Sequence, residues 1–233
     1  MINLHQRSYQ KELMDADDIP FEAIAQTLKE LNFINTWLGG HAITMSGIKQ
    51  LTNRNGKLTI CEVGCGGGDN LFAIHKWCTQ KKIPARFIGI DMNAECIAFA
   101  QKQYPQLACQ WICSDYEKVQ FNENKPNIIF SSLFCHHFTD EQLITMFQWL
   151  NQNSQDGFFI NDLHRHWLAY YLIKWLAKIF SKSRLIKNDA PLSVARGFKK
   201  KEIKKLFDDA AIKNLKIKWK WAFRWLLIVQ DKT

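Results

Sequence analysis

The chain has 233 residues, of which 47% are apolar. It is therefore long enough for one domain with a large core and short for two, and its composition argues against global disorder. The formal net charge of +9 is uneven, because residues 163–233 hold 18 Lys and Arg against 5 Asp and Glu. Such a basic half suits nucleic acid, anionic lipid or an acidic small molecule, or else forms a solvated lysine surface.

Cysteine spacing and hydropathy argue against several classes of protein. The seven cysteines form neither a compact disulfide framework nor a zinc-finger pattern, so we expect buried reduced thiols, no metal site and a cytoplasmic location. The segment Met1–Asp18 lacks the apolar stretch of a signal peptide. No uncharged apolar run approaches the roughly 20 residues that a membrane-spanning helix needs.

The first part of the chain is expected to be helical. Apolar residues recur at helical spacing between Phe21 and Ile34, and Gly39-Gly40 interrupts the pattern. A second helix is expected over His41–Leu51, followed by a turn at Asn53–Gly56.

From residue 58 onward, short β-rich runs alternate with helical stretches. The expected strands are Leu58–Val63, Arg86–Ile90, Ala108–Cys113, Asn127–Ser132 and Gly157–Leu163. The helices expected between them are Asp69–Lys81, Ala94–Tyr104 and Asp140–Leu150. This alternation predicts βαβ units and a parallel sheet that is covered on both faces.

The C-terminal part departs from that alternation. The expected elements are helices at His166–Phe180 and Lys199–Ala210 and strands at Leu215–Trp221 and Trp225–Val229, the last two forming an antiparallel hairpin. We therefore predict an α/β fold, a Rossmann-like doubly wound sheet of about seven strands, mostly parallel, with an antiparallel C-terminal hairpin. We expect a single domain over 1–233, in which 1–55 form a helical N-terminal extension or lid and 56–233 form the catalytic fold.

A glycine-rich turn, Glu62-Val63-Gly64-Cys65-Gly66-Gly67-Gly68, joins the first of these strands to a helix. Glycine lets the backbone approach a ligand, and the helix N-terminus offers free N–H groups. The spacing is G-x-G-x-G, whereas dinucleotide folds have G-x-G-x-x-G. Asp91 and Asp115 follow the next two strands, where a carboxylate can accept hydrogen bonds from both hydroxyls of a ribose.

These motifs, in this order, resemble those of class I S-adenosylmethionine (SAM)-dependent methyltransferases, and the resemblance extends from about Leu58 to the C-terminus. It implies an enzyme that binds SAM and releases S-adenosylhomocysteine (SAH). The cofactor contacts that it implies are Glu62, Gly64, Cys65, Gly66, Gly68, Asp91, Met92, Asp115, Tyr116 and Ser131.

Histidines follow the fourth and fifth strands, where both segments open onto the same crevice of a doubly wound sheet. Methyl transfer from a sulfonium is an in-line displacement that depends on positioning. A phenol acceptor with a pKa near 10 is only ~0.1% ionised at pH 7. Removing its proton at that pH costs about 4 kcal/mol, and a base in the site can lower this cost. We expect His136, His137 or His164 to be that base, with a structural role as the alternative for each.

The helix that begins near Trp167 carries two apolar rows and one lysine row. The rows are Trp167, Tyr171, Trp175 and Ile179; Leu168, Leu172, Leu176 and Phe180; and Lys174, Lys178 and Lys182. This pattern is typical of a helix in a membrane interface, and also of a core helix whose lysines reach water. In the first interpretation the helix lines a hydrophobic substrate pocket, and the protein makes peripheral contact with the inner face of an anionic membrane.

The segments Ile160–Leu172, Pro191–Phe198 and Leu38–His41 resemble bacterial small-molecule methyltransferases of type III polyketide pathways, and more loosely those of quinone pathways. This implies a small hydrophobic or aromatic acceptor, phenolic or polyketide-like, with His41, Arg165 and Arg196 as candidate wall residues. An RNA methyltransferase is an alternative because of the basic half, but no amine-methylation motif or RNA-binding module supports nucleic acid as a partner. A non-catalytic SAM-fold partner protein is another alternative, and the acceptor atom stays open between oxygen, carbon and nitrogen.

Overall fold

The computed structural model describes residues 3–16, 19–52 and 56–230, so most of the expected turn at Asn53–Gly56 lies outside the described residues. Seven strands form one sheet in the order β3-β2-β1-β4-β5-β7-β6. The strands are β1 (Leu58–Val63), β2 (Ala85–Asp91), β3 (Cys109–Cys113), β4 (Ile128–Ser132), β5 (Gly157–Leu163), β6 (Leu215–Lys220) and β7 (Arg224–Gln230). Strands β1 to β5 pair in parallel, and β7 runs antiparallel to both β5 and β6. The expected fold class is therefore confirmed.

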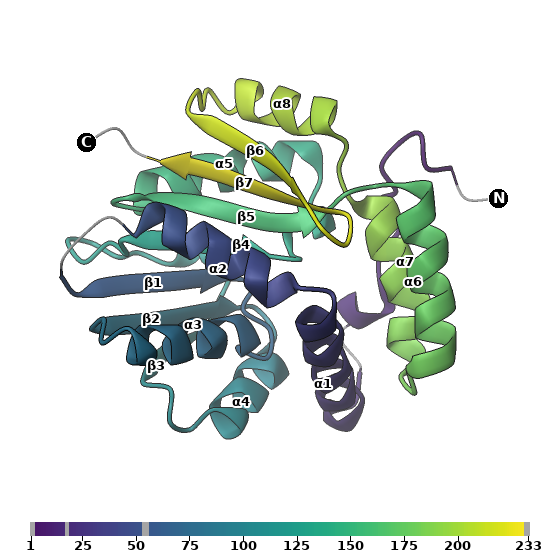
Figure 1. The fold of residues 1–233 in the computed structure, drawn as a ribbon, viewed down its shortest axis with the longest axis horizontal. Helices are drawn as coiled ribbons and strands as arrows, with labels where there is room; N and C mark the ends of the chain where they lie inside the picture. The colour runs from purple at the N-terminus through teal and green to yellow at the C-terminus, as the bar shows by residue number, and fades with distance from the viewer. Residues whose placement is uncertain (1–2, 17–18, 53–55, 231–233) are drawn as a thin grey trace.

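Helices cover both faces of the sheet (Figure 1). They are α1 (Phe21–Trp37), α2 (Gly40–Leu51), α3 (Asp69–Gln80), α4 (Ala94–Gln103), α5 (Asp140–Asn153), α6 (Trp167–Phe180), α7 (Arg184–Arg196) and α8 (Lys200–Asp209). Apolar residues of α2, α3 and α4 pack on one face of the sheet, and those of α5 and α8 pack on the other. Strands β4 and β7 are buried along nearly their whole length, as their continuous apolar runs predict.

Helix α7 was not expected from the sequence. Pro191 lies inside it, and a proline removes one backbone hydrogen bond and usually ends a helix. Tertiary packing overrides that preference here, because α7 packs along α6 and buries Ile186, Leu192 and Val194. The Ser183 hydroxyl also accepts a hydrogen bond from the backbone N–H of Ile186 and caps the first turn.

The N-terminal strap, residues 3–16, runs across the end of the sheet where the parallel strands finish. Three bonds of the Arg7 side chain fix it: Nε donates to the Arg196 carbonyl at 3.2 Å, Nη2 to the Phe138 carbonyl at 2.8 Å, and Nη1 pairs with Asp140 at 2.6 Å. Further along, the backbone N–H groups of Leu13 and Met14 donate to the carboxylate of Asp189 in α7. The strap is thereby tied to the loop after β4 and to α7.

Helices α1 and α2 meet at Gly39, whose φ of +74° is a left-handed conformation that favours glycine. Ile24 and Leu28 of α1 pack against Phe99 of α4, so α1 stands beside the glycine turn (Figure 1). Within the described ranges, no helix has both the length and the apolar character that crossing a membrane requires.

Candidate active site

A cavity of about 880 Å³ lies at the carboxyl ends of the parallel strands, which is the usual ligand position in such sheets. The glycine turn and the end of β2 line one part of it, and the loop after β4 lines another. The N-terminal strap, helices α1, α4, α6 and α7 and the β6–β7 hairpin line the rest of it. The acidic strand ends and the histidine pair therefore share one cavity with a largely apolar wall.

The glycine turn has the backbone that its sequence predicts. Gly64, Gly66 and Gly68 have φ values of +71°, +48° and +76°. A Cβ on Gly64 would lie 2.3 Å from the Phe134 ring, and one on Gly68 would lie 2.6 Å from the Trp111 ring. The backbone N–H groups of Gly64 and Cys65 donate to the Ile90 carbonyl at 2.9 and 3.0 Å and hold the turn against β2. Glycine is required at both crowded positions.

Two acidic side chains stand at the glycine turn. Asp91 accepts from the backbone N–H of Gly66 at 2.8 Å and from that of Asn93 at 2.9 Å, while burial raises the pKa of its carboxyl. Glu62 is buried in β1, and its Oε1 accepts from Asn70 Nδ2 at 2.9 Å. Its Oε2 has no hydrogen-bond partner among the residues described. Burial raises the pKa of Glu62 well above its usual range, with Asp69 adding to the effect.

The structure brings only part of the expected cofactor set to the cavity. Met92 lines it with the glycine turn, Glu62 and Asp91. Asp115 lies outside the cavity lining and caps the short helix Tyr116–Lys118. The Tyr116 ring is buried edge-on against the Phe138 and Trp149 rings. Ser131 Oγ donates to the Val63 carbonyl at 2.9 Å and is fully buried between strands.

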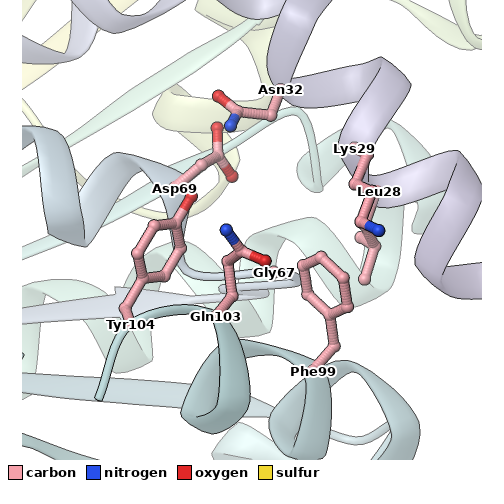
Figure 2. A pocket seen from close by; sticks show the side chains of 8 residues that line it. All are labelled: Leu28, Lys29, Asn32, Gly67, Asp69, Phe99, Gln103 and Tyr104. Atoms are coloured by element: carbon pink, nitrogen blue, oxygen red, sulfur yellow. The ribbon is translucent and has the colours of Figure 1, made fainter.

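A smaller recess of about 90 Å³ adjoins the other side of the glycine turn. Figure 2 shows Asp69, Gln103 and Tyr104 facing Lys29 and Leu28 of α1 across it. Gly67 and Asp69 line both the recess and the large cavity, so the recess lies where α1 packs over the glycine turn. It is too small for a nucleoside and belongs to the same site.

The histidine pair is covered by acids from the strap. His136 and His137 lie in the short helix Cys135–His137 after β4. His136 Nδ1 is 2.8 Å from Asp162 Oδ1, and its Nε2 is 3.5 Å from Glu12 Oε1. His137 Nδ1 is 3.0 Å from Asp15 Oδ1, and its side chain is 25% exposed whereas that of His136 is 3% exposed. Of the two, His137 is therefore the one accessible to a bound molecule.

The charges in this cluster stabilise one another. Burial alone would lower the pKa of His136, but the carboxylates of Asp162 and Glu12 outweigh it and raise the pKa to about 9. Burial also acts to raise the pKa of Glu12 and Asp162, yet the His136 imidazolium holds both below their usual values. His136 is consequently protonated at neutral pH.

Glu12, His136 and His137 place one potential metal ligand atom each within 4.8 Å of one another. Arg196 argues against a cation at their centre, because its Nε is 3.9 Å from Glu12 Oε1 and its Nη1 is 3.5 Å from Asp15 Oδ2. A guanidinium that already neutralises these carboxylates would repel a metal ion. We interpret the group as an ion-paired cluster.

Four further residues that were expected in the catalytic or substrate site lie outside the cavity lining. The His164 Nδ1 accepts from Trp219 Nε1 at 3.2 Å, and burial lowers the pKa of His164 to about 4. Arg165 is fully buried, where it binds the Leu4 and Gly197 carbonyls and pairs with Glu202. Arg196 donates to the His136 and His137 carbonyls and positions the pair. His41 Nε2 pairs with Asp69 Oδ2 at 2.6 Å. Asp69 lines the cavity, whereas His41 lies behind it.

Among the charged residues of the cavity that sequence reasoning missed are Glu12, Asp15 and Arg224. The two acids are more than 100 positions from the histidines, and no local pattern connects them. Arg224 had a usable signal, because it is a lone cation at the start of a continuously apolar strand. It is 3% exposed, and its Nη2 donates to Asn35 Oδ1 at 2.9 Å.

The residues present fit the expected cofactor SAM. A glycine cradle with no room for side chains lets an extended ligand approach the backbone. Asp91 offers carboxylate oxygens at the end of β2, where hydroxyl groups of a ribose can donate. The unpartnered Glu62 Oε2 is a buried acceptor suited to a cation.

Residues 60–157 match the family described as "Methyltransferase domain". No curated protein matches the sequence. Among solved structures, the plantazolicin methyltransferase BpumL, in complex with a monoazolic desmethylPZN analog and SAH, is 18% identical with a TM-score of 0.68, over 94% of this chain and 92% of that one.

Two further solved structures are similar. A putative O-methyltransferase from Nostoc punctiforme PCC 73102 is 13% identical with a TM-score of 0.61, over 89% of this chain and 60% of that one. The magnesium protoporphyrin IX methyltransferase from Synechocystis PCC 6803, with bound SAH, is 14% identical with a TM-score of 0.51, over 90% and 84%. At such identities the likeness shows the fold. The family match covers β1 to the start of β5, which includes the glycine turn and the histidine pair.

Proposed function

We propose that the protein, a methyltransferase that uses SAM, methylates a small hydrophobic acceptor with a phenolic or polyketide-type hydroxyl. The observation that carries this proposal is the shared cavity, in which His137 and the glycine turn lie within one apolar enclosure. Leu31 and Ile34 of α1 and Ile173 and Leu176 of α6 are among its apolar wall residues. Such a wall favours an aromatic or aliphatic acceptor over a polar one.

The charge of the cavity lining further restricts which class of acceptor can bind. Its lining includes the acidic side chains Glu12, Asp15, Glu62, Asp69, Asp91, Glu95 and Asp189. These carboxylates favour a cationic methyl donor and disfavour an acceptor that carries a carboxylate or phosphate. A neutral phenol, pyrone or quinol can pack against the apolar wall and carries no negative charge that these carboxylates would repel. The quinone-like and polyketide-like classes that the sequence suggests both meet this description.

SAM, held by the glycine turn, Glu62 and Asp91, would supply a methyl group carried on a positively charged sulfur. The apolar wall of the cavity would orient the acceptor and exclude water. His137 would accept the proton that the acceptor hydroxyl gives up. Asp15 at 3.0 Å from His137 Nδ1 stabilises the imidazolium that results. His136, already protonated, keeps Glu12 and Asp162 in place beside it.

Labelling tests the reaction and the acceptor together. Wild-type protein incubated with methyl-labelled SAM and neutral phenolic or pyrone lipids should yield a product one labelled methyl group heavier by mass spectrometry. His137→Gln should lower kcat by about 10²–10⁴-fold, the usual contribution of a general base, with little change in SAH binding. His75→Gln, on α3 away from the cavity lining, is the control.

Three results would contradict the proposal. Labelled product that forms only on carboxylated or phosphorylated acceptors would overturn the acceptor class. A kcat for His137→Gln equal to that of His75→Gln would overturn the base. Methylation of RNA in place of any small molecule would move the function to the alternative that the basic half suggests.

We also propose that the protein is cytoplasmic and binds peripherally, through α6, to the inner face of an anionic membrane. Helix α6 buries only Ala169 and Ala177 among its side chains, and this does not fit the interpretation of it as a core helix. Trp167, Trp175 and Phe180 are 60%, 58% and 71% exposed, and Lys174 and Lys178 are exposed beside them. Aromatic residues flanked by lysines suit the interface of a bilayer that carries negative charge.

A further inference from the structure

We infer that Phe223, at the tip of the β6–β7 hairpin, determines which acceptor ring fits the cavity, and that the strained backbone of Ala222 and Phe223 holds its side chain there. This inference rests on the proposed function, because the ligand that it concerns is the neutral phenolic acceptor. It assigns a role to a residue outside the glycine turn, the histidine pair and the strap.

The backbone at the tip of the hairpin is strained. Ala222 has a φ of +42° and Phe223 has a φ of +55°. Residues other than glycine rarely adopt this left-handed conformation, and it is least favourable for a bulky side chain. The turn is short, because Lys220 and Arg224 already pair across the two strands. Strain of this kind persists only where the surrounding structure holds it, and it gathers at functional sites.

The places where such strain occurs separate this turn from ordinary cases. Among the described residues other than glycine, six have a φ between +42° and +60°. Lys82 and Ala211 lie just past the ends of α3 and α8, and Asn122 lies in a turn, positions where a left-handed residue is common. The other three all line the cavity, namely Leu133, Ala222 and Phe223. The strain that no helix end or asparagine turn explains is therefore found at the cavity.

The contacts of Phe223 show what holds the turn in place. The backbone N–H of His164 donates to the Phe223 carbonyl at 2.8 Å and ties the tip to the end of β5. The Phe223 ring stacks on the His166 ring, with 5.0 Å between centroids and 24° between planes, and the Trp219 ring meets it edge-on at 6.1 Å. His166 Nδ1 in turn accepts from the first turn of α6. The ring is therefore fixed between two walls of the cavity, the hairpin and α6.

Three neighbouring strands bring apolar residues to one side of the cavity. Leu133 follows β4, Leu163 ends β5 and Phe223 precedes β7, and these strands are adjacent in the sheet. All three residues are half-buried and line the cavity. Two strand spacings separate β4 from β7, so this apolar floor is about 10 Å across. The proposed base, His137, lies in the same loop as Leu133, so a ring on this floor would be close to the base.

A fixed aromatic side chain selects its ligand by shape. A phenolic acceptor gains a ring–ring contact with Phe223 that an aliphatic alcohol lacks. Because stacking on His166 and the bond from His164 hold Phe223 in place, its ring also limits the width of the acceptor. We therefore expect a one-ring phenol to fit better than a phenol with two fused rings.

Two left-handed alanines provide a matched pair of variants. Ala222→Gly and Ala211→Gly remove the same kind of strain and leave every ring in place, so each should raise the thermal midpoint by about 2–4 °C. Ala222→Gly should also raise KM for para-propylphenol by about three- to tenfold, because the freed turn no longer fixes Phe223. Ala211→Gly, outside the cavity lining, should keep the wild-type KM. SAH affinity, measured by calorimetry, should stay within about twofold of wild type in both variants.

The ratio of two acceptors tests the ring itself. Phe223→Ala should raise kcat/KM for β-naphthol relative to para-propylphenol by about tenfold, because loss of the ring leaves room for a second fused ring. A residue that only stabilises the fold would change the turnover of both phenols alike. Phe33→Ala removes an exposed phenylalanine of α1 outside the cavity lining and should keep the wild-type ratio.

An unchanged ratio in Phe223→Ala that still binds SAH would overturn the role of Phe223. If Phe223→Ala does not fold, the same ratio in Phe223→Leu decides. A wild-type KM in Ala222→Gly would overturn the role of the strained turn. Wild-type protein that binds SAH but methylates no neutral phenol would overturn the proposed acceptor and this inference with it. Methylation of both phenols by the wild type, with no change of ratio in the variants, overturns this inference alone.

Discussion

His136 couples the stability of the protein to pH. Its imidazole is fully buried, yet Asp162 and Glu12 raise its pKa to about 9 from the ordinary 6.5. A group whose folded pKa is raised stabilises the fold below its unfolded pKa, and this contribution is lost as pH rises through the folded value. The same charge that makes His136 unsuited to accept a proton at neutral pH therefore strengthens the site.

We expect His136→Asn to remove up to about 3 kcal/mol of pH-dependent stability, the equivalent of a shift from 6.5 to about 9. Wild-type protein should lose free energy of unfolding between roughly pH 6.5 and pH 9, and the variant should lose distinctly less. Urea unfolding at several pH values measures both slopes. Equal slopes for the two proteins would show that His136 is not held as an imidazolium.

The N-terminal strap is the element that completes the catalytic wall. Glu12 and Asp15 reach the histidine pair from it, and Arg7, Gln10 and Leu13 tie it to the rest of the fold. The strap has one short 3-10 helix, Leu13–Asp15, so tertiary bonds hold it in place. Its contribution should appear in turnover, because Glu12 and Asp15 lie beside His137, the proposed base, and the bonds that hold the glycine turn against β2 do not involve the strap.

Replacing both strap acids, in Glu12→Gln/Asp15→Asn, should lower kcat by roughly 10–100-fold, because His137 loses the carboxylate that orients it. SAH affinity should stay within about threefold of wild type. Glu22→Gln, an exposed acid in the first turn of α1, provides the control. A strap variant with unchanged kcat, or with SAH affinity lost in proportion to kcat, would contradict this role.

At the scale of the whole molecule, exposed aromatic residues gather at the mouth of the cavity. Trp175 of α6 and Trp221 of the β6–β7 hairpin are 58% and 72% exposed and also line the cavity. Residues of the hairpin tip, α1 and α6 line the same cavity, and Figure 1 shows where these three segments lie in the fold. A membrane-bound face of this kind would let a lipophilic acceptor enter directly from the bilayer.

Vesicle co-sedimentation tests that arrangement. Wild-type protein should sediment with anionic vesicles and less with neutral ones, and binding should weaken as salt rises. Lys174→Gln/Lys178→Gln on α6 should reduce binding roughly 30-fold, since each lysine near the surface contributes about 1 kcal/mol. Lys201→Gln/Lys204→Gln on α8 removes the same charge elsewhere and should bind like wild type. Equal losses in both double variants, or no sedimentation at all, would contradict membrane docking.

The sequence predicted elements and the cofactor loop far better than the acceptor side. Periodicity and glycine spacing are local, so β1, the turn after it and Asp91 could be placed from neighbouring residues alone. Helix α7 escaped because Pro191 is a local signal against helix that packing on α6 overrides. Arg165 differs in another way, since the resemblance to polyketide-pathway enzymes implied a wall residue, whereas carbonyls from the strap hold its side chain inside the protein.

The strap also sets when the site can form during synthesis. Its residues are synthesised before any strand of the sheet. Asp189 and Arg196, to which the strap binds, follow 176 and 186 positions after their partners Leu13 and Gln10. The glycine turn and its neighbouring strands can assemble earlier, from contacts close in sequence. A nascent chain would therefore acquire a place for the methyl donor well before it could carry out the transfer, and the growing protein stays inactive until its last quarter is complete.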